Sequence, residues 1–173
     1  MSAASSGFKP PDFTDWPWQA VRQHKVGGKV ASNVASKVDS DDIPAKVDLP
    51  ASVGAYALQI RLDRALRIPV KRLGEPTLKA GLYLYVGSAY GPGGIASRVG
   101  RHLRRTKKIH WHVDHLTAEG RVTALAVFSD GIECELLERA LQSTPKSYNI
   151  AVPVAGLGSS DCRRCPSHLL RLK

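Results

Sequence analysis

Two short segments in which apolar side chains recur at every second residue constrain the fold most strongly. In residues 55–60 this series starts at Tyr56, and in residues 82–86 Tyr83 and Tyr85 lie on the face opposite the aliphatic residues. A period of two is typical of β-strands, because successive side chains of a strand point to opposite faces of a sheet. The two segments therefore predict strands that present tyrosine phenols side by side.

The rest of the pattern predicts a mixed fold. Strand-like segments cover residues 53–62, 81–87 and 122–128, with a weaker one at 68–72, and helix-like spacing covers residues 95–106, 110–117 and 133–142. The sequence after Pro145 is typical of loops. We expect a small α/β or α+β domain with a mostly antiparallel central sheet of about three to five strands flanked by helices.

The first 50 residues differ in composition from the rest. Ser, Ala, Pro, Gly and Lys dominate residues 1–50, which predicts a flexible, disordered extension in front of a single domain at residues 51–173. Trp16-Pro17-Trp18 is the exception. We expect this segment to dock on the domain, because two indoles bury a large apolar area in any groove they find.

The chain is strongly basic, with 25 Lys and Arg against 15 Asp and Glu and a net charge of +10. Such an excess favours a polyanionic partner over a merely soluble basic surface, since basic side chains release the counterions condensed on phosphates. The charges cluster between Arg98 and Lys108. We expect contacts with nucleic acid, DNA rather than RNA, from this group and a neighbouring histidine: Arg101, Arg104, Arg105, Lys107, Lys108 and His112.

Hydropathy and cysteine content bear on the compartment. No apolar run has the length of a membrane span, and the N-terminus lacks a charged-then-apolar signal pattern. Three cysteines, an odd number, argue against a secreted disulfide scaffold. We expect a soluble cytoplasmic protein without a membrane partner, associated with the nucleoid or nucleus when bound to DNA.

Several short motifs together resemble a known family. They are Gly54-Ala55-Tyr56, Tyr85-Val86-Gly87-Ser88-Ala89, Arg98 with Arg101-His102, His110-Trp111-His112-Val113-Asp114, Glu133-Cys134, Gly158-Ser159-Ser160-Asp161-Cys162 and Ser167-His168-Leu169. From about Ser52 to Leu170 the chain resembles the GIY-YIG nuclease superfamily, and most of all a small uncharacterised domain found alone or fused to endonuclease III-type glycosylases. It departs from the superfamily in the long insertion between Tyr56 and Tyr85 and in the alanine of the first tripeptide.

The resemblance implies a metal-dependent endonuclease, with a role in DNA repair or in the processing of branched DNA. Tyr56 would be the general base, Tyr85 would orient it or the attacking water, and Arg98 would contact the scissile phosphate. A glutamate on the third helix would hold Mg²⁺ or Mn²⁺: Glu133 by comparison with the small subfamily, or Glu138 by comparison with the repair nucleases. The alternative for both tyrosines is ordinary packing in a sheet.

Two expectations about this site follow from physical chemistry. A phenol is a poor base at neutral pH, so we expect positive charge from Arg98 or the metal to lower the pKa of Tyr56. Arg98 and His102 are four residues apart in a predicted helix and face the same way, so if Arg98 reaches the phosphate, His102 can reach it or the leaving group. A surface position is the alternative for His102.

Cysteine and histidine spacing indicates a possible second metal site. Cys162, Cys165 and His168 have the spacing of zinc ligands, and Cys134 would complete a Cys₃His tetrahedron that organises the tail. The alternatives are buried thiols with a packing histidine. Another set, His110, His112, Asp114 and His115, lacks the spacing of helical zinc hydrolases, so nucleic-acid contact and packing of Trp111 are preferred for it.

The sequence leaves three functions open. The first is the endonuclease, the second a nucleic-acid-binding module without activity, and the third a zinc-stabilised interaction protein. Tyr56, Tyr85, Arg98 and a candidate metal glutamate are all present, which favours the first.

Overall fold

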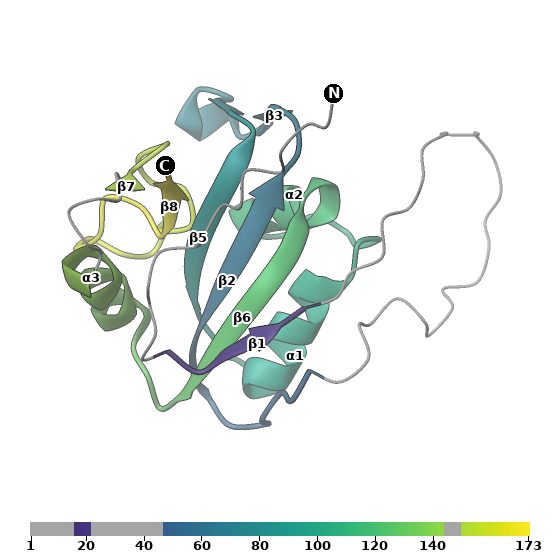
Figure 1. Ribbon diagram of the computed structural model, residues 1–173, viewed down its shortest axis with the longest axis vertical. Coiled ribbons are helices and arrows are strands. Elements are labelled where there is room, and N and C mark those ends of the chain that lie inside the picture. Colours follow the sequence, from purple (N-terminus) through teal and green to yellow (C-terminus); the bar gives the residue numbers. More distant parts are fainter. Residues whose placement is uncertain (1–15, 22–46, 144–149) are drawn as a thin grey trace, which may run out of the picture.

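A six-stranded antiparallel sheet forms the centre of the protein, as seen in a computed structural model that describes residues 16–21, 47–143 and 150–173 (Figure 1). The strand order is β1-β6-β2-β5-β8-β7. The strands are β1 (Trp18–Ala20), β2 (Gly54–Leu62), β5 (Gly81–Ser88), β6 (Arg121–Ser129), β7 (Ile150–Ala151) and β8 (Leu169–Leu172). The predicted α+β class is confirmed, with one strand more than the upper end of the expected range.

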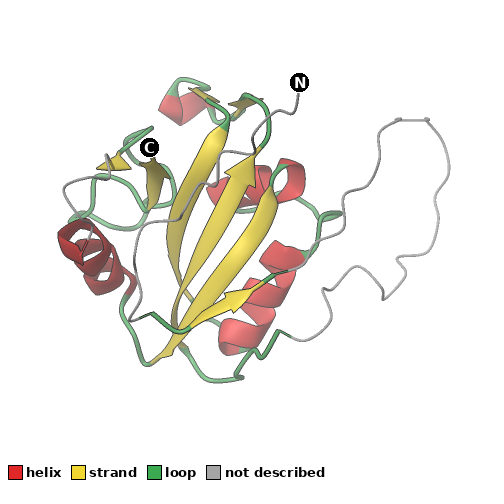
Figure 2. Ribbon diagram, in the orientation of Figure 1, coloured by secondary structure: helices red, strands yellow, loops and turns green. Residues whose placement is uncertain are grey.

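Helices cover both faces of the sheet (Figure 2). Two of them, α1 (Gly94–Leu103) and α2 (His112–Glu119), pack on the face that carries the phenols of Tyr56 and Tyr85. The third, α3 (Glu133–Ser143), packs on the opposite face. Both faces of β2 and β5 are buried. The residues that alternate with the tyrosines and point to the opposite face are therefore apolar as well.

The register between β2 and β5 confirms the predicted arrangement of the tyrosines. Tyr56 lies opposite Gly87, and Leu58 lies opposite Tyr85, so the two phenols are diagonal neighbours on one face. Their ring centroids are 6.2 Å apart.

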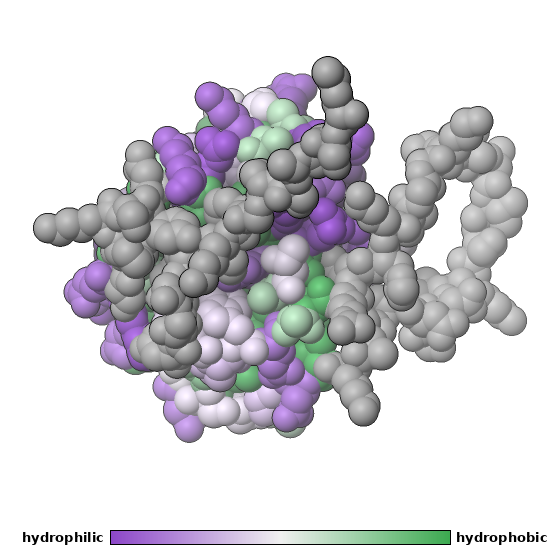
Figure 3. Space-filling model, in the orientation of Figure 1, coloured by the Kyte–Doolittle hydropathy of each residue, from purple (hydrophilic) through white to green (hydrophobic). Residues whose placement is uncertain are grey.

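The tryptophan segment docks on the domain, as predicted, and does so as a strand. β1 pairs with β6, and Trp16 is buried on the face covered by α3, where its ring meets Phe128 edge to face at 5.2 Å. Residues 16–21 therefore pack on the domain, with residues 18–20 as a strand of the sheet, and are not part of a disordered extension. Residues 1–15 and 22–46 lie outside the described part of the chain. In Figure 3 hydrophilic side chains gather mainly around the edge of this face, and paler and more hydrophobic residues occupy its lower centre.

Three predictions of secondary structure were wrong. The strand expected at 68–72 is instead a short hairpin of β3 (Leu66–Arg67) and β4 (Thr77–Leu78) around a 3₁₀ turn, η2 (Lys71–Leu73), because Pro69 has no N–H to donate to a ladder. The first helix ends at Leu103, not near residue 106, since Arg104 is extended. The tail contains β8, which contributes Leu169 to one core cluster and Leu170 to the other.

Among the described residues, no helix is both long and apolar enough to cross a membrane.

Candidate active site

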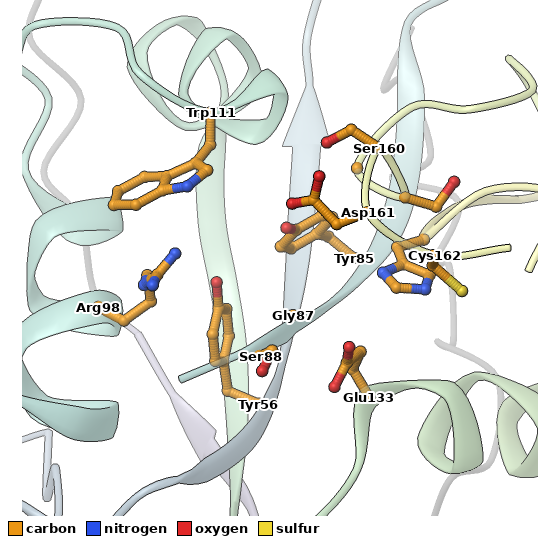
Figure 4. Close-up of a pocket in the computed structure, with 13 residues that line it drawn as sticks. Tyr56, Tyr85, Gly87, Ser88, Arg98, Trp111, Glu133, Ser160, Asp161 and Cys162 are labelled. Atoms are coloured by element: carbon orange, nitrogen blue, oxygen red, sulfur yellow. The ribbon is translucent and has the colours of Figure 1, made fainter. Parts of the chain in front are cut away.

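A pocket of about 150 Å³ opens where β2 begins and β5 ends. Figure 4 shows that its walls come from several parts of the fold: the tyrosines from the sheet, Arg98 from α1, Trp111 from the residue before α2, Glu133 from the start of α3, and Ser160 and Asp161 from the loop before Cys162. Arg98 points toward the phenol of Tyr56 across the pocket. The structure thus brings together Tyr56, Tyr85, Arg98 and Glu133, as the sequence predicted.

Two glycines of the tyrosine motifs are needed for close approach. A methyl group on Gly87 would lie 2.4 Å from the Tyr56 hydroxyl oxygen, so only glycine lets the phenol lie against β5. Gly54 has φ +149°, and a methyl group there would lie 2.1 Å from the Phe128 carbonyl oxygen of β6. Gly87 therefore lets β5 approach the Tyr56 ring, and Gly54 lets the start of β2 approach β6.

Tyr56 begins a hydrogen-bonded chain of three side chains, which we call the Tyr56–His102–Asp114 chain. The Tyr56 hydroxyl lies 2.8 Å from His102 Nε2, and His102 Nδ1 lies 3.0 Å from Asp114 Oδ1. His102 and Asp114 are buried. His102 lies on the side of Arg98, but behind Tyr56 and not among the residues that line the pocket. The expected contact of His102 with the phosphate or the leaving group was therefore wrong, because both of its ring nitrogens are bound to Tyr56 and Asp114.

Asp114 is held in place by four donors. Its Oδ2 accepts hydrogen bonds from Arg101 Nη2 at 2.9 Å and from the backbone N–H groups of His110 at 2.9 Å and Trp111 at 3.1 Å. The last bond caps α2, because Asp114 is the third residue of this helix and Trp111 precedes its first. Burial alone would raise the pKa of Asp114, but the bonds from His102, Trp111 and His110 hold it well below its usual range.

The protonation of the chain follows from these contacts. Burial lowers the pKa of His102, and the hydrogen bond to Asp114 opposes this shift without cancelling it, so His102 is neutral at pH 7. The ionised Asp114 can only accept, so Nδ1 carries the proton. Nε2 is then an acceptor, and the Tyr56 hydroxyl donates to it.

We expected positive charge to lower the pKa of Tyr56, but the protein's own residues raise it. Burial raises the pKa of Tyr56 well above its usual value and Tyr85 raises it further, while Arg98 lowers it by a smaller amount. Burial also raises the pKa of Tyr85 to about 12. Tyr56 is therefore a protonated phenol at rest, and it can act as a base only if its own proton passes to His102.

Arg98 has a defined position at the pocket. Its Cζ lies 4.1 Å from the centroid of the Trp111 ring, and Trp111 also lines the pocket. Stacking on the indole face restrains the guanidinium while leaving its N–H groups free to meet an anion. Trp111 is partly buried against the core, as predicted.

The two candidate glutamates lie in different surroundings. Glu133 lines the pocket. Glu138 is exposed on α3, forms an ion pair with Arg164 and is not a lining residue. The geometry therefore favours Glu133 as the carboxylate of this site.

The predicted nucleic-acid-binding residues are not one exposed patch. Arg104 and Lys108 are exposed, whereas Arg101 is bound to Asp114, and Arg105 donates to the Gly120 carbonyl. Lys107 donates to the His102 carbonyl and to Thr117, and burial lowers its pKa to about 8. His112 lines a second pocket next to the first. Half of the predicted set thus holds α1 and α2 together.

Cys134, Cys162, Cys165 and His168 form one cluster, as the sequence predicted. Their ligand atoms all lie within 4.8 Å of one another, and the Sγ atoms of Cys134 and Cys162 are 3.5 Å apart. Tetrahedral zinc with Zn–S bonds of about 2.3 Å needs sulfurs about 3.8 Å apart, so the cluster fits such an ion. Backbone N–H of Cys165 donates to Cys162 Sγ at 3.3 Å, a contact that stabilises a thiolate. The cluster can hold a metal ion, and in the described residues no other group of this kind occurs.

Sequence reasoning missed the role of Asp114. It was noted only beside the nearby histidines, and that set forms no metal cluster. One signal in the sequence could have identified Asp114 as a buried helix cap. It is an acidic residue at the third position of a helix, and the nearby Val113 and Leu116 are apolar. Ser160 and Asp161 line the pocket but stand out in the sequence only as part of a motif, and no sequence pattern indicates Arg72.

Together these features define an α+β domain with a phenol–imidazole–carboxylate chain at a pocket lined by an arginine and two carboxylates, and a Cys₃His cluster that can hold a metal ion beside it. Residues 55–173 match the family described as domain of unknown function DUF123. The chain belongs to this family. No curated protein and no solved structure matches it.

Proposed function

We propose that the protein is a metal-dependent endonuclease that hydrolyses phosphodiester bonds in DNA, of the GIY-YIG type that its motifs resemble. The observation that carries this proposal is the Tyr56–His102–Asp114 chain, whose phenol lines a pocket together with Arg98 and Glu133. Buried ordinary tyrosines need one hydrogen-bond partner, and Tyr83 on the same strand face has a backbone carbonyl. Tyr56 instead bonds to a neutral imidazole that is oriented by a carboxylate, an arrangement suited to proton transfer.

Each residue of the site would have its own role in the reaction. As the Tyr56 oxygen takes a proton from the attacking water, its own proton moves to His102 Nε2, and Asp114 stabilises the imidazolium that forms. Arg98 binds the scissile phosphate and offsets its developing charge. Tyr85 positions the water beside Tyr56.

The pocket suits a divalent cation. Glu133 and Asp161 both line it, and carboxylate oxygens are the ligands that Mg²⁺ and Mn²⁺ prefer. Glu133 would hold the ion, which would supply charge neutralisation at the phosphate and at the leaving oxygen. The Cys₃His cluster, in contrast, offers soft ligands, and we propose that it holds structural Zn²⁺.

The test is cleavage of supercoiled, flapped and branched DNA with Mg²⁺ or Mn²⁺. We expect Tyr56→Phe and Arg98→Ala to lower the rate by at least about 10²-fold. Tyr83→Phe and Arg64→Ala are matched controls, since Tyr83 lies on the same face of the sheet away from the pocket and Arg64 is an exposed arginine paired with Glu119. A native protein that binds these DNAs and cuts none of them is a binding module, and the nuclease proposal is then wrong.

The zinc proposal has its own test. Purified under reducing conditions without chelators, the protein should contain one zinc per chain, and Cys162→Ser should contain less. A native protein with clearly less than one equivalent contradicts the proposal.

A further inference from the structure

A second pocket of about 130 Å³ adjoins the first and shares four residues with it. The shared residues are Tyr85, Trp111, Gly158 and Ser160. Its remaining walls are Arg72, His110 and His112. Arg72 comes from η2, in the insertion between the two tyrosine strands, and has no place in the mechanism above.

The contacts of His112 fix which of its ring nitrogens carries a proton. The backbone N–H of Gly158 donates to His112 Nδ1 at 3.2 Å, so Nδ1 has no hydrogen. Burial and the charge of Arg72 lower the pKa of His112, so its ring is neutral at pH 7. The single ring proton is therefore on Nε2.

This assignment leaves two donors facing each other. Arg72 Nη2 lies 3.0 Å from His112 Nε2, yet both groups carry hydrogens and neither can accept. An oxygen anion between them would accept from both. A phosphate oxygen suits this position, because a guanidinium and an imidazole N–H are strong donors to phosphate.

We infer that Arg72 and His112 form a second phosphate site, which binds a phosphodiester next to the scissile one on the same nucleic-acid strand. The inference rests on the proposed function in that the scissile phosphate occupies the first pocket. The shared wall of Tyr85 and Trp111 lets one strand pass from one pocket into the other. The insertion, which the superfamily resemblance does not explain, then has a role: it supplies Arg72 to the strand.

The first experiment measures binding, without cleavage. Affinity for a short single-stranded DNA is measured without divalent metal over a range of salt concentrations, for the native chain and for Arg72→Gln. We expect the variant to bind about tenfold more weakly. Its plot of log affinity against log salt should be shallower by about 0.7, the value for one phosphate contact on a single strand.

Arg67→Gln is the matched control. Arg67 lies in the same hairpin and is bound to Glu75, so its loss should change neither the affinity nor the salt dependence. An Arg72→Gln variant with native affinity and native slope overturns the inference.

The second experiment observes His112 directly. Nitrogen NMR of the imidazole should show the proton on Nε2 in the free protein, and the oligonucleotide should shift that signal in the native chain but not in Arg72→Gln. A proton on Nδ1, or a response to inorganic phosphate without one to the oligonucleotide, refutes the assignment.

The two proposals fail separately. If binding depends on Arg72 but no DNA is cut with either metal, the second phosphate site stands and the nuclease proposal fails. If DNA is cut and Arg72→Gln has the native KM and salt slope, the nuclease proposal stands and the second site fails.

Discussion

Replacing Asp114 by Asn is the sharpest test of the Tyr56–His102–Asp114 chain. Asn keeps the shape of the side chain but has one acceptor oxygen and one NH₂ group. Three of the four donors around Asp114 meet Oδ2, and only His102 meets Oδ1. The amide oxygen should therefore take the Oδ2 position, which places the NH₂ group against His102 Nδ1.

This orientation reverses the tautomer of His102. Nδ1 becomes an acceptor, the ring proton moves to Nε2, and Nε2 then donates to the Tyr56 oxygen. Tyr56 can no longer pass its proton to the imidazole. The wrong tautomer in the comparable serine-protease triad costs about 10⁴-fold in rate, and we expect a loss of about 10³- to 10⁴-fold here.

The stability effect is worked from the same contacts. Hydrogen bonds to a charged group contribute about 1.5–3 kcal/mol and neutral ones about 1 kcal/mol, so the loss of charge at three bonds should lower the free energy of unfolding by about 1.5–6 kcal/mol. Because the folded pKa of Asp114 is depressed, its contribution is complete above the unfolded pKa of about 4 and is lost as the pH falls toward the folded pKa. The difference between native and variant should shrink in that range.

Three assays test this prediction: cleavage rate, urea unfolding at several pH values, and nitrogen NMR of His102. Asp63→Asn is the control, because Asp63 is an exposed partner of Arg121 and should change stability by less than about 1 kcal/mol. A folded Asp114→Asn protein that cuts within threefold of the native rate, or whose His102 keeps its proton on Nδ1, refutes the reasoning.

Three further outcomes are expected. Gly87→Ala should lower the free energy of unfolding by about 1–3 kcal/mol and the cleavage rate by about 10²-fold, because the new methyl displaces the Tyr56 ring. Gly100→Ala, whose new methyl would meet only the Leu49 side chain at 4.0 Å, should do neither, and equal effects would contradict the packing argument. Removal of zinc by a chelator should lower Tm by about 10 °C, and Cys165→Ser should lower it similarly without chelator, whereas an unchanged Tm in both contradicts a structural ion. Ultraviolet titration of the folded, metal-free protein should be the same for native and Tyr56→Phe up to about pH 11, since burial raises the Tyr56 pKa; a phenol lost near pH 10 in the variant contradicts this.

A strand could be predicted from the sequence where the side chains on its two faces are of different kinds, because they then alternate along the chain. Tyr56 and Tyr85 marked their strands because phenols alternate with aliphatic residues, and the register places them as expected. β8 gave no such signal. Leu169 and Leu170 face two different core clusters, so both are apolar and the alternation disappears.

The sequence was enough to predict which residues form the site, but not which hydrogen bonds join them. Helical spacing correctly placed His102 on the side of Arg98, yet the partner of His102 comes from another helix and is twelve positions further along the chain. Only the packing of α1 against α2 brings Asp114 to Nδ1. The same packing turns Arg101 and Lys107 inward, although their charge alone predicts contacts with nucleic acid.

The long insertion between the tyrosine strands does not disturb the site, for a topological reason. It joins Leu62 to Gly81, which pair at the end of β2 and β5 far from Tyr56 and Gly87. Antiparallel pairing fixes the two strands residue by residue, so extra chain at one end leaves the register at the other unchanged. The insertion is thus free to take a separate role, and its η2 turn places Arg72 beside His112. The feature that departs most from the pattern that the motifs resemble is therefore the one that, at the proposed second phosphate site, would extend the contact with a DNA strand.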